Sequence, residues 1–568
     1  MRTKDENIKI AKLLFPDVKE KVDDIFKKYP KRNLEEGAMV LRFAPSPTGF
    51  LHTGSVYTSM VGVKLAKQSN GIAILRIEDT DKKREVEGGI SLIVNGLKGF
   101  GIEFDEGPIN ETEQVGEYGP YIQSQRLDIY KVFAKDMVEK GTAYPCFITD
   151  EELAEIREKQ EELGVRTGYY GDWAKWRNAT VEEIEKEIKE GKSFVIRLYS
   201  TGDIDKSFEM TDRIKGRFTL RENDMDIVLL KSDGFPTYHF AHPIDDTLMG
   251  ITLVIRTEEW FASVPIHYEL FQKLGFKQIE YAHPAPLMKL DNEGKSKRKL
   301  SKRKDPEADV QYYIENGYPN EAIIEYFLTL ANSNFYDWRI QNSNIDTNEF
   351  QLKLEKFNKA GALFDIVKLE DICKDYIATL SAEEIYGRSL NWAREYDEEV
   401  AKILEENQEY CINIFNIERS GQKIRKDMVK FKDSKEQLRI FFDRFFDEDS
   451  YEDISSRVSK DVQKEIVQKY INIYNPDDDS TVWFDNVKKL GEELGFCSDR
   501  KEYETNREKY KGTVGDIAMV LRVAITKKTQ SPDLYQVMNV LGKEKVVQRL
   551  EKYAGEILKQ RESHCLLP

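Results

Sequence analysis

The chain has 568 residues, of which 40% are hydrophobic, 11% aromatic and 33% charged. This length predicts about three to five domains, and the apolar fraction is ample for several packed cores, which excludes a wholly disordered chain. The net charge of −16, from 86 Lys and Arg against 102 Asp and Glu, argues against a protein that coats DNA non-specifically, but RNA binding needs only a local basic face.

Neither a membrane segment nor a secretory signal is predicted. No uncharged apolar run approaches the ~18 residues that a membrane-spanning helix needs, and the amino end lacks an apolar core. The five cysteines lie far apart, at Cys146, Cys373, Cys411, Cys497 and Cys565. They indicate reduced thiols, so we expect a cytoplasmic protein, and no two of them have the spacing of zinc ligands.

The first 37 residues form a polar extension with a helical pattern. Apolar positions recur three and four residues apart in 8–14 and 18–26, and Pro30 and Gly37 mark the end of the extension. The sequence does not indicate what this extension does.

A strand–helix–strand–helix order follows the extension. Residues 38–44 form a short apolar run typical of a buried strand, and 45–49, with two prolines and a glycine, predict a tight turn. A helix is expected from His52 to about Gln68, a strand over 72–77 and a helix over 90–100. This order is typical of a parallel, doubly wound sheet.

Residues of about 116–237 have a mixed pattern and predict an insertion into this sheet. Strand signals at 226–230 and 253–256 indicate that the sheet resumes afterwards. From about residue 321 the helical period dominates, and 475–480 is typical of a linker between two helical parts. Within the insertion, helices are expected at 150–163 and 181–189 and a strand at 194–199.

The first candidate site is the segment 42–55, in which a strand leads through a turn with Gly49 and Gly54 into a helix. The amino end of a helix offers unpaired N–H groups and a positive dipole end, which suit a phosphate. His52 would lie there and could donate to a phosphate oxygen whose charge grows in the transition state. The alternative is an ordinary strand–turn–helix corner with a capping histidine.

The second candidate site is the segment 295–304, in which seven of ten residues are basic. Taken alone, such a run is usually a solvated face or a nucleic-acid patch. Together with the first site, its stretch Lys299–Arg303 predicts a lysine loop that closes on ATP phosphates and neutralises the charge developed during adenylyl transfer.

These two strings carry a resemblance to the class I aminoacyl-tRNA synthetases, and among them to the bacterial-type glutamyl-tRNA synthetases. His52–Ser55 stands at the family's HIGH-type signature and Lys299–Arg303 at its KMSKS-type signature. The resemblance is dense over about residues 38–340 and looser beyond. Further matching strings are 75–81, 121–130, 229–238 and 245–256, with weaker ones at 357–369, 512–526 and 541–550.

The resemblance implies an α/β fold: a Rossmann-like parallel-sheet catalytic domain split by an acceptor-binding insertion and followed by an all-α anticodon-binding region. The expected parts are a helical extension (1–37), the first catalytic half (38–115), the acceptor-stem-binding insertion (116–237), the second catalytic half (238–290), a stem-contact region with the KLSKR loop (291–372), and a helical anticodon-binding region (373–568) with a break near 475–482.

The implied activity is that of a glutamate–tRNA ligase. Glutamate and ATP would form glutamyl-adenylate and pyrophosphate, and the glutamyl group would pass to the 3′-terminal adenosine of tRNA(Glu). Mg²⁺ is expected with ATP, held mainly by phosphates and water. The implied partners are tRNA(Glu), glutamate and ATP, without a membrane, and the family favours a monomer.

The resemblance also assigns the nucleotide side of the site. His52 and Lys302 would stabilise the phosphoryl transition state, and Lys299 and Ser301 would shape the closing loop. The full ATP-binding set is Thr48, Gly49, His52, Gly54, Ser55, Glu258, Lys299, Leu300 and Lys302.

The implied glutamate pocket consists of Arg42, Ala44, Ser46, Glu78, Tyr238, His242 and Arg256. Arg42 resembles the residue that grips the side-chain carboxylate, Arg256 a second substrate arginine, and Glu78 the acidic partner of the α-amino group. Arg42 could instead be a surface arginine and Glu78 a helix cap. Tyr238 could be ordinary core, and His242, where some members carry asparagine, a packed polar group.

The chain departs from the family's pattern in three places. After Arg256 it has Thr257–Phe261, where many relatives have Gly-Glu-Asp-His. Where many relatives carry a zinc-binding cysteine cluster in the insertion, only Cys146 remains, so no structural zinc is expected. The extension of 37 residues is longer than in many bacterial members.

The best candidate for an RNA face in the helical tail is 423–439, with seven basic residues against three acidic ones. A solvated helix face is the alternative. The tentative tRNA-binding residues are Lys423, Arg425, Lys426 and Lys430.

Four other functions share parts of this sequence pattern. A glutaminyl-tRNA synthetase shares the catalytic core, but its usual tail is a β-barrel. A shortened relative that glutamylates a tRNA base and the small nucleotidylyltransferases lack parts present here. An RNA-binding pseudo-synthetase would be expected to have lost His52, Lys299 or Lys302. The sequence leaves open whether tRNA(Gln) is charged as well as tRNA(Glu).

Overall fold

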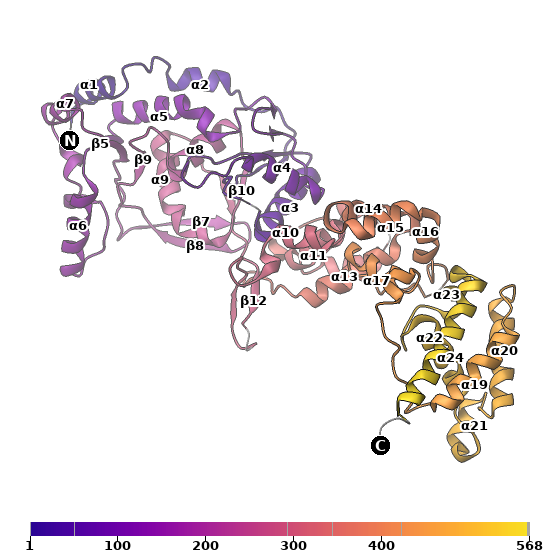
Figure 1. Cartoon of the computed structure of the whole chain (residues 1–568). Coiled ribbons are helices and arrows are strands. Elements are labelled where there is room, and N and C mark those ends of the chain that lie inside the picture. Colours follow the sequence, from indigo (N-terminus) through magenta and orange to yellow (C-terminus); the bar gives the residue numbers. More distant parts are fainter. Residues whose placement is uncertain (1, 50, 292–293, 344, 422, 565–568) are drawn as a thin grey trace. The chain divides into compact units, whose positions relative to one another are not determined.

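The computed structural model describes residues 2–49, 51–291, 294–343, 345–421 and 423–564 (Figure 1). The chain divides into two compact units: the first contains residues 1–313 and 323–366, and the second contains 314–322 and 367–568. The six predicted parts are finer than this division and stay a prediction. In the described part of the chain, no helix is long and apolar enough to cross a membrane.

A parallel sheet forms the centre of the first unit. Strand β1 (Val40–Phe43) pairs in parallel with β2 (Ile72–Leu75), and α3 (Thr53–Gln68) connects them. Strand β10 (Leu253–Ile255) pairs in parallel with β11 (Glu280–Ala282). The backbone N–H of Thr252 donates to the Val40 carbonyl over 2.9 Å and so joins the two strand pairs. The predicted Rossmann-like sheet is therefore confirmed.

Helices flank these strands in alternation along the chain. Their bounds are Gly89–Gly99 for α4, Tyr238–Leu248 for α8 and Val264–Leu274 for α9. The buried residues of these helices are largely apolar, as expected of helices that cover a sheet.

The insertion contributes a second sheet, in the order β5 (Ala143–Cys146), β6 (Val195–Leu198), β9 (Val228–Leu230). It also contains α5 (Leu127–Glu139) and two charged helices, α6 (Asp150–Glu162) and α7 (Val181–Lys189).

A hairpin of the insertion extends the catalytic sheet. Its strands are β7 (Ser207–Asp212) and β8 (Gly216–Arg221), and Asp212 of β7 pairs with Tyr281 of β11. The strand order there is β10-β11-β7-β8. The insertion is thus tied to the strands that carry the candidate site.

The amino-terminal extension packs into the first unit. Helices α1 (Lys4–Leu14) and α2 (Val22–Lys28) both contact α5 (Figure 1). Beyond them, the Arg32 guanidinium donates two hydrogen bonds, each of 2.7 Å, to the Glu106 carboxylate and one of 2.7 Å to the Met249 carbonyl. The extension is therefore part of the core of this unit.

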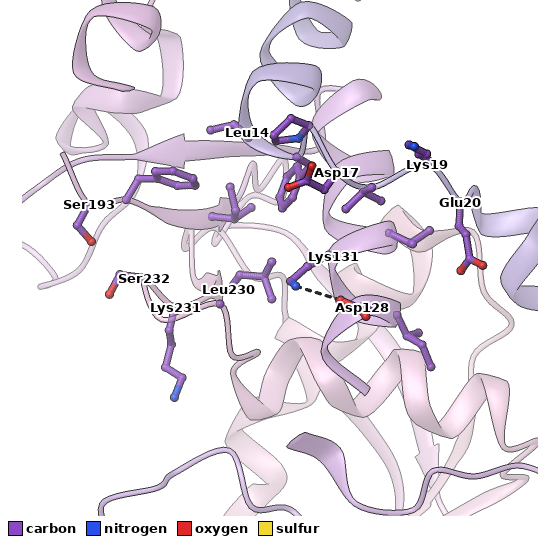
Figure 2. Close-up of a pocket in the computed structure, with 18 of the residues that line it drawn as sticks. Leu14, Asp17, Lys19, Glu20, Asp128, Lys131, Ser193, Leu230, Lys231 and Ser232 are labelled. Atoms are coloured by element: carbon purple, nitrogen blue, oxygen red, sulfur yellow. Dashed lines mark hydrogen bonds and ion pairs between the residues drawn. The ribbon is translucent and has the colours of Figure 1, made fainter. Parts of the chain in front are cut away.

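A cavity of about 820 Å³, the extension cavity, lies beside the link between α1 and α2 (Figure 2). Residues 14–20 form one wall, and α5 with the ends of β6 and β9 forms the others. Its rim is charged, and two of its lysines pair with nearby acids. Lys131 Nζ lies 3.0 Å from Asp128 Oδ1, and Lys28 Nζ lies 2.6 Å from Glu20 Oε1.

The rest of the first unit includes the antiparallel hairpin of β12 (Met288–Leu290) and β13 (Lys297–Lys299), which carries the start of the KLSKR segment. Helices α11 (Asn320–Ala331) and α12 (Phe335–Gln341) follow.

The described part of the second unit is helical, which confirms the predicted all-α tail. Its longer helices are α13 (Ile366–Thr379), α14 (Ala382–Tyr396), α15 (Glu398–Glu406), α16 (Gln408–Phe415), α17 (Ser434–Arg439), α19 (Lys460–Ile473), α20 (Ser480–Leu494), α22 (Val514–Thr526), α23 (Leu534–Leu541) and α24 (Lys543–His564). The predicted break near 475–482 falls at the turn between α19 and α20. Buried residues on both sides of it belong to one hydrophobic cluster, so a division there stays a prediction.

Candidate active site

The turn between β1 and α3 places His52 at the amino end of α3. His52 is the N-cap, and its Nδ1 accepts a hydrogen bond of 2.9 Å from the Gly54 N–H. Gly49 has a φ of +118°, which a residue with a side chain rarely adopts, so the turn requires glycine there. The N–H groups of Gly54, Ser55 and Val56 all donate to His52, so the helix start attracts an anion chiefly through the positive end of its dipole.

The chemistry of His52 follows from this hydrogen bond. Burial, aided by the positive charges of Lys302 and Lys299, lowers the pKa of His52. The neutral imidazole accepts at Nδ1 and must therefore carry its proton at Nε2. His52 can donate a hydrogen bond from Nε2 without acting as an acid.

One cavity of about 600 Å³ brings the two sequence motifs together. It lies between the β1–α3 turn, the end of β10 and the KLSKR segment. The predicted residues that line it are Arg42, Ala44, Ser46, Thr48, Gly49, His52, Gly54, Ser55, Arg256, Lys299, Leu300 and Lys302. Segments far apart in the sequence thus share this active-site cavity.

Arg256 holds most of its hydrogen-bonding groups within the protein. Its Nε donates to His283 Nε2 over 3.0 Å, and its Nη1 donates to the Tyr238 hydroxyl over 2.8 Å. Its Nη1 also lies 3.2 Å from His267 Nδ1. Nη2 is buried and has no hydrogen-bond partner among the described residues. Because an unsatisfied buried donor is costly, Nη2 is suited to an acceptor on a ligand.

Tyr238 and His242 do not line the cavity, and the structure gives them supporting positions. Tyr238 accepts from Arg256, and its ring centroid lies 4.5 Å from that of Trp260. His242 is fully buried, with Nδ1 2.7 Å from Asp246 Oδ2 and Nε2 2.8 Å from the Tyr281 hydroxyl. Nε2 is thus hydrogen-bonded and Nδ1 lies beside a carboxylate inside the core, which favours the packed polar group over a substrate contact.

A buried ion-pair network lies behind Arg42. Arg42 Nε lies 3.3 Å from Asp246 Oδ2, and Arg76 Nη1 donates to Asp246 Oδ1 over 2.6 Å. Despite burial, Arg42 and Arg76 hold the pKa of Asp246 well below its usual range. The network fixes the Nε side of Arg42, which lines the active-site cavity.

Glu78 is a partly buried carboxylate at the edge of this network and does not line the active-site cavity. Its Oε1 lies 3.5 Å from Arg76 Nη2 and has no hydrogen-bond partner among the described residues. Burial raises the pKa of Glu78, while the charges of Arg76 and Arg42 act in the opposite direction. An ammonium group would satisfy this oxygen.

Asp305 anchors the KLSKR segment. Arg298 donates to both Asp305 carboxylate oxygens, over 2.6 and 2.7 Å, and the Ser301 N–H donates to Asp305 Oδ2 over 3.0 Å. Lys299 pairs with Glu259, and Lys302 Nζ lies 3.5 Å from Asp309 Oδ2. Both lysine side chains stay partly exposed and line the cavity.

Glu258 and Ser301 lie outside the cavity lining. The Glu258 carboxylate pairs with Lys215 of the insertion hairpin, which places it beside the site. Ser301 supports the loop through its backbone. Sequence reasoning missed several supporting residues, although some lie inside the matching strings: Arg76, Asp212, Asp246, Glu259, His267, His283 and Asp305.

Much of the basic charge predicted to face RNA is paired within the second unit. Arg425 Nε lies 2.9 Å from Asp427 Oδ1, and Lys426 Nζ lies 2.8 Å from Asp375 Oδ1. Lys430 Nζ lies 5.1 Å from the Tyr318 ring centroid, and Lys423 is exposed. Their contact with tRNA stays a prediction.

Comparisons with known proteins agree with this geometry. Residues 38–371 match the family model of the class I (E and Q) tRNA synthetase catalytic domain, and 504–554 match an anticodon-binding domain. A glutamate–tRNA ligase of Clostridium perfringens (strain SM101 / Type A) is 46% identical, over 96% of this chain and 99% of that protein. One from Clostridium beijerinckii is 48% identical, over 96% and 99%.

Solved structures lead to the same group. The crystal structure of a glutamate tRNA ligase from Elizabethkingia meningosepticum, in complex with its amino acid, matches with a TM-score of 0.71 and 28% identity, covering 92% of this chain and 100% of that one. The chain therefore belongs to the glutamate–tRNA ligase family of the class I tRNA synthetases.

Proposed function

We propose that this chain activates glutamate with ATP and transfers it to the 3′-terminal adenosine of tRNA(Glu). One observation carries the proposal: the active-site cavity joins a helix amino end suited to phosphate with two arginines suited to carboxylates. One of these, Arg256, keeps a buried donor without a partner among the described residues. Glutamate and ATP supply the matching chemical groups.

In the first step, a carboxylate oxygen of glutamate bonds to the α-phosphorus of ATP. The bond from this phosphorus to the bridging oxygen breaks, and pyrophosphate leaves with the electron pair. Nε2–H of His52 donates to a phosphate oxygen, the positive dipole end of α3 attracts the phosphates, and Lys299 and Lys302 neutralise their charge. ATP enters with Mg²⁺ held by its phosphates and water. No protein nucleophile is required.

Glutamate recognition divides among three charged side chains. Arg42 binds the side-chain carboxylate, and Nη2 of Arg256 donates to a second acceptor on the substrate. Oε1 of Glu78 accepts from the ammonium group. Ala44 and Ser46 complete the cavity wall.

In the second step, a hydroxyl oxygen of the 3′-terminal adenosine of tRNA bonds to the carbonyl carbon of glutamyl-adenylate, the bond from that carbon to the phosphate oxygen breaks, and AMP leaves. The insertion binds the acceptor end and the helical second unit the anticodon, in a monomeric enzyme. The supporting observations are the match of residues 504–554 to an anticodon-binding domain and the names of the relatives.

Pyrophosphate exchange into ATP tests the proposal, with glutamate or glutamine, each with and without total tRNA. We expect exchange with glutamate in the presence of tRNA. Exchange with glutamine but not with glutamate would make the chain a glutaminyl-tRNA synthetase and refute the assignment of the glutamate pocket. No exchange from folded protein with cognate tRNA would refute the activity. Charging assays with purified tRNA(Glu) and tRNA(Gln) then determine the range of tRNA substrates.

A further inference from the structure

Two buried side chains stand in line behind Arg256. Arg256 Nε lies 3.0 Å from His283 Nε2, and His283 Nδ1 lies 2.7 Å from Asp212 Oδ2. The side chains of His283 and Asp212 are both 0% exposed. Neither belongs to the motifs that the sequence analysis singled out, and neither lines the active-site cavity.

The hydrogen-bond inventory of arginine determines where the imidazole proton lies. A guanidinium has only donors and stays protonated in proteins, so His283 Nε2 must accept. The proton of the neutral ring is then at Nδ1 and is donated to Asp212. Burial lowers the pKa of His283, which agrees with a neutral ring. Although burial acts the other way, hydrogen bonds from His283, Lys215 and Ile214 lower the pKa of Asp212, which agrees with a carboxylate.

Asp212 is itself fixed by the insertion hairpin. Its Oδ1 accepts from the backbone N–H groups of Ile214, over 2.9 Å, and Lys215, over 2.8 Å. It ends β7 and pairs with Tyr281 of β11, two residues before His283. Its Oδ2 accepts from the imidazole of His283 and, over 3.1 Å, from the backbone N–H of the same residue.

We propose that Asp212 and His283 are positioning residues for glutamate binding. Asp212 holds His283 in the tautomer that accepts from Arg256 Nε, and this contact keeps Nη2 of Arg256 directed to the substrate. The β7–β8 hairpin of the insertion thereby takes part in building the amino-acid pocket. The inference rests on the role of Arg256 in the proposed function and deepens it.

The other edge of Arg256 provides a contrast. Nη1 has two acceptors, the Tyr238 hydroxyl and His267 Nδ1. His267 Nε2 lies 3.0 Å from His239 Nδ1, and burial lowers the pKa of His267 well below its usual range. If Nη1 loses one of these acceptors, it keeps the other. Nε, in contrast, has His283 as its one acceptor among the described residues.

The substitution Asp212→Asn tests the tautomer. Asparagine keeps an oxygen for the two turn amides but presents an NH₂ group to His283 Nδ1. The imidazole proton then moves to Nε2, where it faces the Arg256 donor. In tRNA-supplemented pyrophosphate exchange, we expect KM for glutamate to rise roughly tenfold to a hundredfold, the range that corresponds to one unsatisfied buried donor. KM for ATP should change by less than about threefold.

Two substitutions of His283 separate the hydrogen bonds from simple packing. In His283→Gln, the amide oxygen accepts from Arg256 while the amide NH₂ donates to Asp212, so KM for glutamate should stay within about threefold of wild type. In His283→Leu, both hydrogen bonds are lost, and KM for glutamate should rise as in Asp212→Asn. If His283→Leu does not fold, comparison of KM for glutamate in His283→Gln and Asp212→Asn still tests the proposal.

The double variant Asp212→Asn with His283→Leu tests whether Asp212 acts on Arg256 through His283. Once the imidazole is gone, the asparagine has no tautomer to change and loses only its contact with the backbone N–H of residue 283, so the double variant should stay within about threefold of His283→Leu. If Asp212 acts only as a turn cap, its substitution multiplies KM equally in both backgrounds. Equal multiplication in both backgrounds would overturn the proposal. So would equal changes of KM for glutamate and ATP in Asp212→Asn, or a KM for glutamate in His283→Gln as high as in His283→Leu. Absence of glutamate-dependent exchange in the wild type would instead refute the proposed function.

Discussion

Two cavities of the first unit differ in whether a buried polar group in the wall lacks a partner within the described part of the chain. The extension cavity is the larger of the two, about 820 Å³, yet Lys131 on its rim pairs with Asp128 (Figure 2). Lys28 on the same rim pairs with Glu20. The active-site cavity is about 600 Å³, but Arg256 Nη2 in its wall is buried without a partner among the described residues. Volume alone therefore does not identify a site. Unsatisfied buried polar groups are the better guide.

The largest predicted effect lies in the active-site cavity, at Lys302. Lys302→Ala removes a charge that neutralises the phosphates in the transition state. We expect adenylate formation to slow by about a hundredfold or more, or roughly 3 kcal/mol of barrier, while the thermal unfolding temperature is unchanged. Single-turnover pyrophosphate exchange with tRNA measures this rate. Lys304→Ala, an exposed lysine of the same segment that does not line the cavity, is the matched control. An unchanged rate in Lys302→Ala would remove Lys302 from the mechanism.

The next effect distinguishes the amino-acid end of the same cavity from its nucleotide end. Arg42→Ala should raise KM for glutamate by about tenfold to a hundredfold and KM for ATP far less, because a lost charge-assisted pair affects the ligand that it binds. Asp246 keeps Arg76 as a partner, so the protein should fold. Steady-state exchange with each substrate varied in turn provides both constants. Equal increases of the two would contradict the role of Arg42.

The contrast between the cavities also shows how far the sequence could predict the site. His52 and the KLSKR lysines lie in contiguous strings, and a short string defines a helix amino end or a lysine loop. The partners that hold Arg256 come from β7, α9 and the segment after β11, and only the fold brings these together. No local pattern indicates such a set.

Fold elements show the same limit. The periodicity of the first 37 residues predicted helices, and α1 and α2 confirm them, but their packing against α5 depends on residues more than a hundred positions away. In the tail, a count of basic residues over 423–439 cannot reveal that Lys426 pairs with Asp375. The periodicity that predicts a helix is a local property of the sequence, whereas the pairing of charges depends on the tertiary structure.

On the extension side, the predicted effects are on stability. Arg32→Ala leaves Glu106 buried without its guanidinium partner, and we expect the free energy of unfolding to fall by about 3 kcal/mol. The kcat/KM of the folded enzyme for glutamate should be unchanged. Chemical denaturation at neutral pH measures the loss. A large loss of kcat/KM at full folding would instead connect the extension to the active site.

The difference in the free energy of unfolding between wild type and Arg32→Ala should depend on pH, which makes the test sharper. Although burial acts the other way, Arg32 and Tyr121 hold the pKa of Glu106 below its usual value. A carboxyl group whose pKa is lowered on folding contributes its full stability above its unfolded pKa and loses it as the pH falls through its folded pKa. The gap between wild type and Arg32→Ala should therefore be full at pH 7 and narrow below about pH 4. A gap that stays constant down to acidic pH would contradict the ion pair.

The smallest effect is predicted at the rim of the extension cavity. The Lys131 side chain is 40% exposed and pairs with Asp128 one helical turn away, and such exposed pairs contribute about 0.2–0.5 kcal/mol. Lys131→Ala should therefore change the free energy of unfolding by less than about 0.5 kcal/mol and leave both KM values unchanged. The result matters because Lys131 lines the larger cavity. If this substitution altered either KM, the extension cavity would be connected to catalysis although no side chain in its wall, among the residues that the structure describes, has a buried polar atom without a hydrogen-bond partner, and the contrast with Arg256 would fail for this protein.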